Sequence, residues 1–230
     1  MKAVLLAAGL GTRLRPLTES MPKCLVPIHG KPLMEYWLDL LLPEHVDHIL
    51  VNTHYLPEVV RDFVQASRWR AALTLVHEHE LLGTGGTVLK NRDFLADGPF
   101  ILAHADNLTR FDVAAFIEAH ERRQPGVEIT MMTFDTDTPK SCGIIEQDAQ
   151  GRVLAFHEKV ANPPGTRANA AVYLFEPSVI AFLASFEKEV IDLSTEVLPH
   201  YLGRMQTFHN ADYHRDIGTL ESLRLAEEEF

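Results

Sequence analysis

Apolar residues along the first half of the chain alternate between short continuous runs and helical spacing. The continuous runs are typical of strands buried on both faces of a parallel sheet; they are Val4–Ala7, Ile49–Asn52, Leu73–Val76 and Phe100–Ala103. Recurrence every three or four positions predicts helices between them; these are Pro32–Leu41, Glu58–Ala66, Thr84–Asn91 and Phe111–Arg122. This alternation predicts an α/β fold with helices on both sides of a mostly parallel sheet.

Beyond Gln124 the pattern changes to strands separated by short turns. The expected strands are Val127–Phe134, Gly143–Glu146, Val153–His157 and Ala170–Phe175. We interpret them as a small strand-rich insertion that covers one end of the sheet. The pattern ends with helices over Pro177–Ser185 and Ser194–Leu202, a strand at Gln206–His209 and a Glu-rich closing helix. No linker or repeat interrupts the chain, so we expect a single domain over residues 1–230.

Composition narrows the class of protein. The chain has 230 residues, 46% of them hydrophobic, which suffices for one α/β domain with a core. No apolar run reaches the eighteen or so residues of a membrane span, and the first strand stands where a secretory leader would be. The net charge of −11 argues against nucleic-acid binding. Cys24 and Cys142 offer neither a disulfide framework nor a zinc site. We therefore expect a cytoplasmic protein with no nucleic-acid or membrane partner.

A glycine-rich loop, Gly9-Leu10-Gly11, follows the first strand. Glycine lets the backbone approach an anion, and successive N–H groups point at it. Arg13, Arg15 and Lys23 add positive charge, so we predict a phosphate site. The loop is not a P-loop, because no Gly-Lys-Ser/Thr follows, and Leu14 stands where a dinucleotide motif has its third glycine. A tight turn without a ligand is the alternative for Gly-x-Gly alone.

The longer string is more specific. It reads Gly9-Leu10-Gly11-Thr12-Arg13-Leu14-Arg15-Pro16-Leu17-Thr18, followed by Pro22-Lys23-Cys24-Leu25-Val26-Pro27. This string resembles the signature of the sugar-1-phosphate nucleotidylyltransferases, and the resemblance spans nearly the whole chain. It implies a Rossmann-like three-layer αβα nucleotidyltransferase fold with a mostly parallel mixed sheet and a small sugar-binding insertion. It also implies a nucleotide-binding part at about 1–123 and a sugar-binding part at about 124–230.

The reaction that the resemblance implies joins a nucleoside triphosphate (NTP) to a sugar 1-phosphate and releases pyrophosphate, with Mg²⁺ as cofactor. Arg13 and Lys23 would be catalytic. The nucleotide-binding residues would be Ala8, Gly9, Gly11, Thr12, Arg13, Gly83, Thr84 and Asp106. Gly83-Thr84-Gly85-Gly86 resembles the helix start that recognises the nucleobase, and a glycine-rich turn alone is the alternative reading.

Two carboxylates are implied as Mg²⁺ ligands. Asp106 follows the buried run that ends at Ala103, at the strand end where open α/β sheets bind ligands. Asp216 lies in Asp216-Ile217-Gly218-Thr219, where a helix cap would be the alternative role. Mg²⁺ takes one or two protein carboxylates and fills its shell with phosphate and water. Ala105 replaces the family's Gly, and Leu220 its common Pro.

The middle of the chain would hold the sugar phosphate. The implied residues are Asn107, Gly143, Glu158, Lys159 and Asn169. Lys159 would bind the phosphate, and Glu158 and Asn169 the sugar hydroxyls. Val160 replaces a Pro of the family pattern, which concerns the local backbone and not the charges. Ala171 replaces a Gly, which predicts a smaller or shifted sugar pocket.

Substrate identity stays open between several readings. The form Gly83-Thr84-Gly85-Gly86 favours GTP with mannose or heptose 1-phosphate, and a UTP-dependent muramyl-1-phosphate uridylyltransferase is the alternative. A non-catalytic nucleotide-sugar sensor is an alternative of another class, and a homo-oligomer is left open. His77-Glu78-His79-Glu80 looks like a metal cluster, but a third ligand is missing. Cys24 is interpreted as a packing residue.

Overall fold

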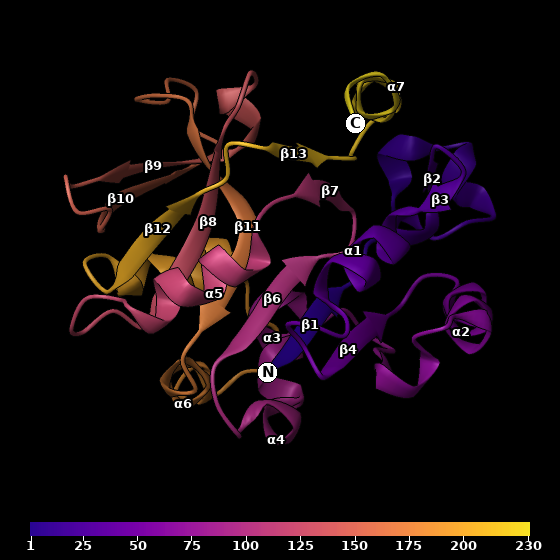
Figure 1. Cartoon of the computed structure of the whole chain (residues 1–230), viewed down its shortest axis with the longest axis horizontal. Helices are drawn as coiled ribbons and strands as arrows, with labels where there is room; N and C mark the ends of the chain where they lie inside the picture. The colour runs from indigo at the N-terminus through magenta and orange to yellow at the C-terminus, as the bar shows by residue number, and fades with distance from the viewer. The chain divides into compact units, whose positions relative to one another are not determined.

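The structure is a computed structural model and describes residues 1–230 (Figure 1). The chain divides into two compact units. The first unit comprises Met1–Leu81, Ala103–Val113 and Asp212–Phe230. The second comprises Leu82–Leu102 and Ala114–Ala211. Each unit is therefore assembled from separated segments, whereas the expected parts followed one another along the chain. The expectation of a single domain stays a prediction.

Parallel strands form the sheet of the first unit. β1 (Lys2–Leu6) pairs with β4 (His48–Thr53) in the register Lys2↔His48, and β4 pairs with β5 (Leu73–His77). β6 (Phe100–His104) spans the boundary between the two units at Leu102 and Ala103. Three of these strands are buried as predicted, but β5 is only half-buried. It forms the edge of the sheet and has a neighbour on one side only.

Helices and short turns complete this unit. The longer helices are α1 (Leu33–Leu41), α2 (Pro57–Ala66) and α7 (Leu220–Glu229). The 3-10 turns cover Thr12–Leu14, Leu17–Glu19, Lys23–Leu25 and Arg70–Ala72, and a small ribbon joins β2 (Pro27–Ile28) to β3 (Lys31–Pro32). None of the helices is long and apolar enough to span a membrane.

An antiparallel pair in the first unit was not predicted from the sequence. β7 (Asn107–Arg110) pairs with β13 (Tyr213–Asp216), and Asn107 lies opposite Asp216. The pair joins segments separated by about a hundred residues of chain, and neither strand has a continuous apolar run. The pairing brings the two aspartate motifs side by side.

The second unit contains the strands expected beyond Gln124. Its helices are α3 (Gly83–Lys90), α4 (Arg92–Leu95), α5 (Val113–Glu121) and α6 (Ser178–Ala184), with a 3-10 turn at Pro139–Ser141. Its strands are β8 (Ile129–Asp135), β9 (Gly143–Gln147), β10 (Val153–Glu158), β11 (Arg167–Phe175) and β12 (Met205–His209). The order is β10-β9-β11-β6, with β8 paired to β11 and β12 paired to β8. The strand-rich region expected from the sequence is thus a set of mutually paired strands.

The helix expected over Ser194–Leu202 is two short pieces. A π-helical turn covers Leu193–Val197, and a 3-10 turn follows over Leu198–Tyr201. Pro199 has no N–H group with which to continue a helical ladder, so it is accommodated in the first turn of a new piece.

Candidate active site

A hydrophobic cluster in the first unit brings three distant segments together. Leu14, Leu108 and Ile217 are all fully buried in it. Each of them is followed or preceded closely by a predicted site residue, namely Arg13, Asp106 or Asp216. Burial of these leucine and isoleucine side chains therefore fixes the backbone from which the polar side chains extend.

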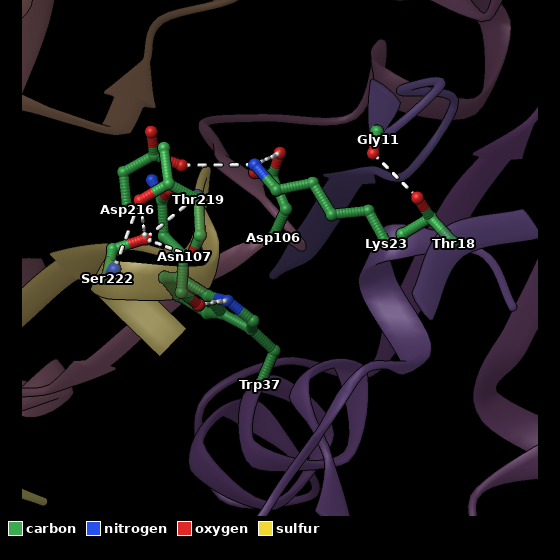
Figure 2. A network of polar contacts seen from close by, with 9 residues as sticks. All are labelled: Gly11, Thr18, Lys23, Trp37, Asp106, Asn107, Asp216, Thr219 and Ser222. Carbon is green, nitrogen blue, oxygen red and sulfur yellow. Dashed lines mark hydrogen bonds and ion pairs between the residues drawn. The ribbon is translucent and has the colours of Figure 1, made fainter. Parts of the chain in front are cut away.

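The glycine loop is anchored at Gly11. This residue is left-handed, with φ +63°, and an added Cβ would lie 3.0 Å from Thr18 Cγ2. Thr18, fully buried, donates from Oγ1 to the carbonyl of Gly11 over 2.7 Å (Figure 2). Both Thr12 and Arg13 are exposed, and nothing lies within 4 Å of a Cβ built on Gly9. The loop is thus fixed at Gly11 by Thr18 and has open space at Gly9.

Two buried polar residues that the sequence reading missed hold the start of this loop. Asn52 accepts a 2.7 Å hydrogen bond from the backbone N–H of Ala7. The amide nitrogen of Asn52 donates to Glu78 over 3.0 Å. Both residues are buried, with Asn52 3% and Glu78 2% exposed. Asn52 is the polar last residue of the predicted run Ile49–Asn52, and this was the available signal, because a buried amide needs partners.

The ammonium of Lys23 lies between the two predicted metal carboxylates (Figure 2). Nζ is 2.6 Å from Asp106 Oδ2 and 3.1 Å from Asp216 Oδ1. The backbone holds the two aspartates together, since the N–H of Ile217 donates to the carbonyl of Asp106 over 3.2 Å. The structure therefore brings together three predicted site residues that are widely separated in the sequence.

Burial and charge act in opposite directions on this triad. Burial alone would lower the pKa of Lys23, but the carboxylates of Asp106 and Asp216 raise it above its ordinary value. Burial would raise the pKa of Asp106, yet the ammonium of Lys23 and the nearby His104 hold it below its usual range. Burial lowers the pKa of the neighbouring His214 to about 3. At neutral pH, Lys23 and Asp106 are therefore charged and His214 is neutral.

The guanidinium of Arg13 lies against Gly218, beside Asp216. A Cβ built on Gly218 would be 2.9 Å from Arg13 Nη2 and 2.8 Å from Asp216 Oδ2. The glycine of the Asp-Ile-Gly-Thr motif thus leaves room for the side chains of two predicted site residues. Thr219 then caps α7. Its hydroxyl accepts from the N–H of Ser222 over 3.1 Å, and the hydroxyl of Ser222 accepts from the N–H of Thr219. Leu220, where the family has Pro, is the first residue of that helix.

The carboxylates suit a divalent cation. They belong to different segments and converge on one positively charged point, and carboxylate oxygen is a preferred ligand of Mg²⁺. Asp216 is half-exposed, with 57% of its side chain accessible, so a polyphosphate could complete the coordination shell. A cavity of about 10 Å³, lined by Gly9, Lys23 and Asp106 among others, gives room for roughly one water. Asn107 is buried beside them, and its carbonyl accepts from Trp37 Nε1 over 2.8 Å.

The second glycine cluster, in the second unit, has a different environment. A Cβ on Gly83 would lie 2.5 Å from the carbonyl oxygen of Ile191, and one on Gly86 would lie 2.1 Å from that of Glu189. The N–H groups of Gly85 and Gly86 donate to the same Ile191 oxygen over 2.9 and 3.3 Å.

The Thr84 hydroxyl of this cluster accepts from the N–H of Leu193 over 2.8 Å. The protein's own chain therefore lies against these glycines, for which the resemblance implied contact with the nucleobase. Nucleotide binding by Gly83 and Thr84 stays a prediction.

Three of the predicted sugar-phosphate residues meet at one end of β9 and β10. Gly143 is the register partner of Glu158. A Cβ on Gly143 would lie 2.7 Å from Glu158 Oε2 and 2.6 Å from the ring of Phe156, which explains the glycine. Lys159 is left-handed, with φ +49°, and its ammonium lies 3.3 Å from Glu158.

Asn169 is the fourth predicted sugar-phosphate residue in the second unit. It lies on the adjacent strand β11, where Ala168 pairs with Ile144 of β9. Its amide donates to the Tyr173 hydroxyl over 2.6 Å and accepts from the N–H of Ala171 over 2.9 Å. These bonds hold a bulge in which Ala171 has φ +53°. Asn169 therefore shapes the local backbone, and its binding to a sugar hydroxyl stays a prediction.

The remaining candidates have structural roles. His77 and His79 form an edge-to-face ring pair at 4.7 Å, while Glu78 turns inward to Asn52. No set of three metal-ligating side chains forms around them. Burial raises the pKa of the Cys24 thiol to about 12, as expected for a packing residue.

Known proteins with sequences similar to this chain act on sugar phosphates. A mannose-1-phosphate guanylyltransferase from Mycobacterium tuberculosis is 31% identical over 226 residues, which cover 96% of this chain and 62% of that protein. A UTP–glucose-1-phosphate uridylyltransferase from Synechocystis is 31% identical over 214 residues, covering 86% of this chain and 54% of that protein. The chain therefore spans little more than half the length of these relatives.

Solved structures of similar fold cover the whole chain. A Bacillus anthracis protein assigned as a glucose-1-phosphate thymidylyltransferase, in complex with sucrose, superposes with a TM-score of 0.89 at 20% identity, over 99% of this chain and 94% of that one. HddC from Yersinia pseudotuberculosis, complexed with GMP-PN, gives 0.80 at 26% identity, over 100% and 99%. These likenesses confirm the predicted Rossmann-like mixed sheet. The family model described as nucleotidyl transferase matches residues 2–230, and the chain belongs to that family.

Proposed function

We propose that this protein transfers a nucleotidyl group from an NTP to a sugar 1-phosphate, producing an NDP-sugar and pyrophosphate. The observation that carries the proposal is the convergence of Lys23, Asp106 and Asp216 beside an open glycine loop that carries Arg13. Such a site combines anion-binding backbone, two cations and two carboxylates, which phosphoryl-group transfer requires. The relatives named above are supporting evidence for the same chemistry.

In this reaction a phosphate oxygen of the sugar attacks the α-phosphorus, and pyrophosphate leaves on the opposite side. The attacking oxygen is already an anion at neutral pH, so the site has no need for a general base. Its task is to hold two anions in line and to stabilise charge on the leaving group.

Arg13 would contact the transferring and leaving phosphates, because its exposed guanidinium extends from the glycine loop. Lys23 would hold the α-phosphate and the sugar phosphate. The loop residues Ala8, Gly9, Gly11 and Thr12 would present backbone N–H groups to the triphosphate. Lys159 would orient the sugar phosphate, with Glu158, Asn169, Gly143 and Asn107 around the sugar.

Asp106 and Asp216 would hold Mg²⁺, which when bound offsets charge on the phosphates of the NTP. The convergence of their oxygens on one point supports this assignment. Both cysteines are free thiols, which agrees with the proposed cytoplasmic setting.

We propose GTP with mannose or heptose 1-phosphate as the substrates, and UTP with muramyl 1-phosphate as the second candidate. The guanylyltransferase relative and the GMP-PN complex of HddC support the first. The uridylyltransferase relative supports UTP as the nucleotide of the second candidate.

Pyrophosphate release by the purified protein with Mg²⁺ tests the proposal. GTP, UTP, dTTP, CTP and ATP are each paired with mannose, heptose, glucose and N-acetylmuramic acid 1-phosphates. One productive pair is expected, with GTP and mannose or heptose as the leading combination. No release from any pair by folded protein that binds nucleotide would overturn the enzyme and favour a nucleotide-sugar sensor.

A further inference from the structure

Lys23 has a position that the proposed reaction does not by itself explain. A lysine that only bound phosphate would be expected to face solvent, where phosphate arrives. Instead, only 10% of the Lys23 side chain is exposed, and its ammonium contacts both carboxylates that are proposed as metal ligands. The ammonium of Lys23 therefore neutralises Asp106 and Asp216.

One position cannot serve both cations. Mg²⁺ binds carboxylate oxygen at about 2.0–2.1 Å, close to the point that the ammonium occupies at 2.6 and 3.1 Å from the two oxygens. Two cations at such separations repel strongly, the more so where Asp106 is buried. A metal ion that takes both carboxylates must therefore displace the ammonium.

The structure allows that displacement. Lys23 begins a short 3-10 turn whose backbone is fixed by the bond from the N–H of Val26, while the charge sits at the end of a flexible four-carbon chain. The negative charge of an arriving polyphosphate would give the released ammonium a new partner. The cation that leaves the carboxylates is thus the one that the reaction needs at the phosphates.

We propose that Lys23 is an internal substitute for the metal: it occupies the carboxylate pair in the free protein and is displaced when a divalent cation binds with the nucleotide. This inference rests on the proposed function, because it takes Asp106 and Asp216 as the metal ligands. Its consequence is weak metal binding by the protein alone, so that metal and nucleotide enter together.

The test is Mn²⁺ binding in the absence of nucleotide, measured by the loss of the free-ion EPR signal. Lys23→Met removes the ammonium, so we expect Mn²⁺ to bind about tenfold more tightly, or better, than to the wild type. Lys31→Met is the matched control, because Lys31 pairs with Asp39 at 2.7 Å, away from the site, and its removal leaves Mn²⁺ affinity unchanged. Equal or weaker binding by Lys23→Met would overturn the inference.

Further variants separate this inference from the proposed function. When Asp106→Asn is added to the Lys23→Met protein, we expect the gain in Mn²⁺ affinity to be lost. If this double variant still binds Mn²⁺ tightly, the ion lies elsewhere, and both the metal assignment and the inference are wrong. If Lys23→Met binds no more tightly but the wild type releases pyrophosphate, the inference alone fails. If binding tightens while every substrate pair is silent, the inference stands and the proposed reaction fails.

A measurement on the wild type guards against misfolding of the variant. Acylation of lysines by a small amine-reactive reagent, read by mass spectrometry, reports how accessible the Lys23 amine is. We expect little modification of the metal-free protein and a clear increase at saturating Mg²⁺ without nucleotide, relative to Lys31, because no phosphate then covers the released amine. Unchanged or greater protection of Lys23 in Mg²⁺ alone at saturation would contradict displacement by the metal.

Discussion

Two glycine clusters, each at the start of a short helical piece, have opposite environments in this molecule. Around Gly9 nothing lies within 4 Å of an added Cβ, and Arg13 nearby is exposed. Around Gly83 and Gly86 the backbone of 189–191 fills the space, and one of its carbonyls takes two of the cluster's N–H groups. Glycine in a sequence marks a close approach, but not whether a ligand or the protein itself makes it.

The largest expected effect comes from the open cluster. In the proposed reaction Arg13 meets the charge that develops on the phosphates, so Arg13→Ala should lower kcat by about 100-fold, as for other lost transition-state contacts. Stability should hardly change, because the side chain is exposed. The measurement is steady-state pyrophosphate release together with thermal unfolding.

Arg61→Ala is the matched control for that prediction. Arg61 is an exposed arginine of α2 that pairs with Glu58 on the same helix. It should leave kcat unchanged. Turnover by Arg13→Ala within a fewfold of the wild type would show that the open loop does not stabilise the reacting phosphates.

The filled cluster should respond in stability. In Gly86→Ala the new Cβ would meet the Glu189 carbonyl oxygen at 2.1 Å, and a backbone atom cannot move aside as a side-chain end can. Alanine would otherwise favour the helix by nearly 1 kcal/mol, but overpacking costs more. We expect a net loss of about 1–3 kcal/mol in the free energy of unfolding.

Urea unfolding of Gly86→Ala and of Gly165→Ala tests this. Gly165 is exposed, with open space around it and no positive φ. Its replacement should leave the free energy of unfolding within about 0.5 kcal/mol of the wild type. A Gly86→Ala protein as stable as the wild type would mean that the chain at 189–191 yields readily, and the cluster would then be open to a ligand after all.

Sequence patterns predicted most of the elements because burial leaves a period in the sequence. β1, β4 and β6 lie at their expected positions to within two residues at each end. The pair β7 and β13 was missed, since these four-residue strands are mostly polar and show no apolar run. That pair is what sets Asp106 beside Asp216.

The candidate site was predictable as a set of residues but not as a geometry. Motif resemblance named Lys23, Asp106 and Asp216, whereas only the fold shows that the lysine occupies the carboxylate pair. The supporting Asn52 and Glu78 were missed because a buried side-chain relay depends on contacts between distant segments.

Gly218 represents a third case, in which functional side chains fill the space. In Gly218→Ala the Cβ would meet Arg13 Nη2 at 2.9 Å and Asp216 Oδ2 at 2.8 Å. Both are ends of flexible side chains, and the backbone is not left-handed, so folding should be retained. Displacing groups that take part in a reaction slows it steeply, so with the proposed roles of Arg13 and Asp216 we expect kcat to fall about tenfold.

The comparison for Gly218→Ala is again thermal unfolding beside turnover. Gly218→Ala should lower kcat with little change in melting temperature, whereas Gly86→Ala should chiefly lower the melting temperature. If Gly218→Ala loses stability to the same extent as Gly86→Ala, the clash is with the backbone and the assignment of its space to Arg13 and Asp216 is wrong.

The smallest effect is expected where a left-handed position lacks glycine. Ala171 has φ +53°, close to the +63° of Gly11, yet it carries a Cβ. Left-handed backbone costs a non-glycine residue about 1–2 kcal/mol, while glycine adds about 0.4–1 kcal/mol of unfolded-state entropy. Ala171→Gly should therefore raise the free energy of unfolding by about 0.5 kcal/mol. Ala170→Gly, at a buried neighbour without positive φ, should lower it. Equal losses in both variants would mean that the bulge held by Asn169 carries no strain, and that alanine is no compromise there.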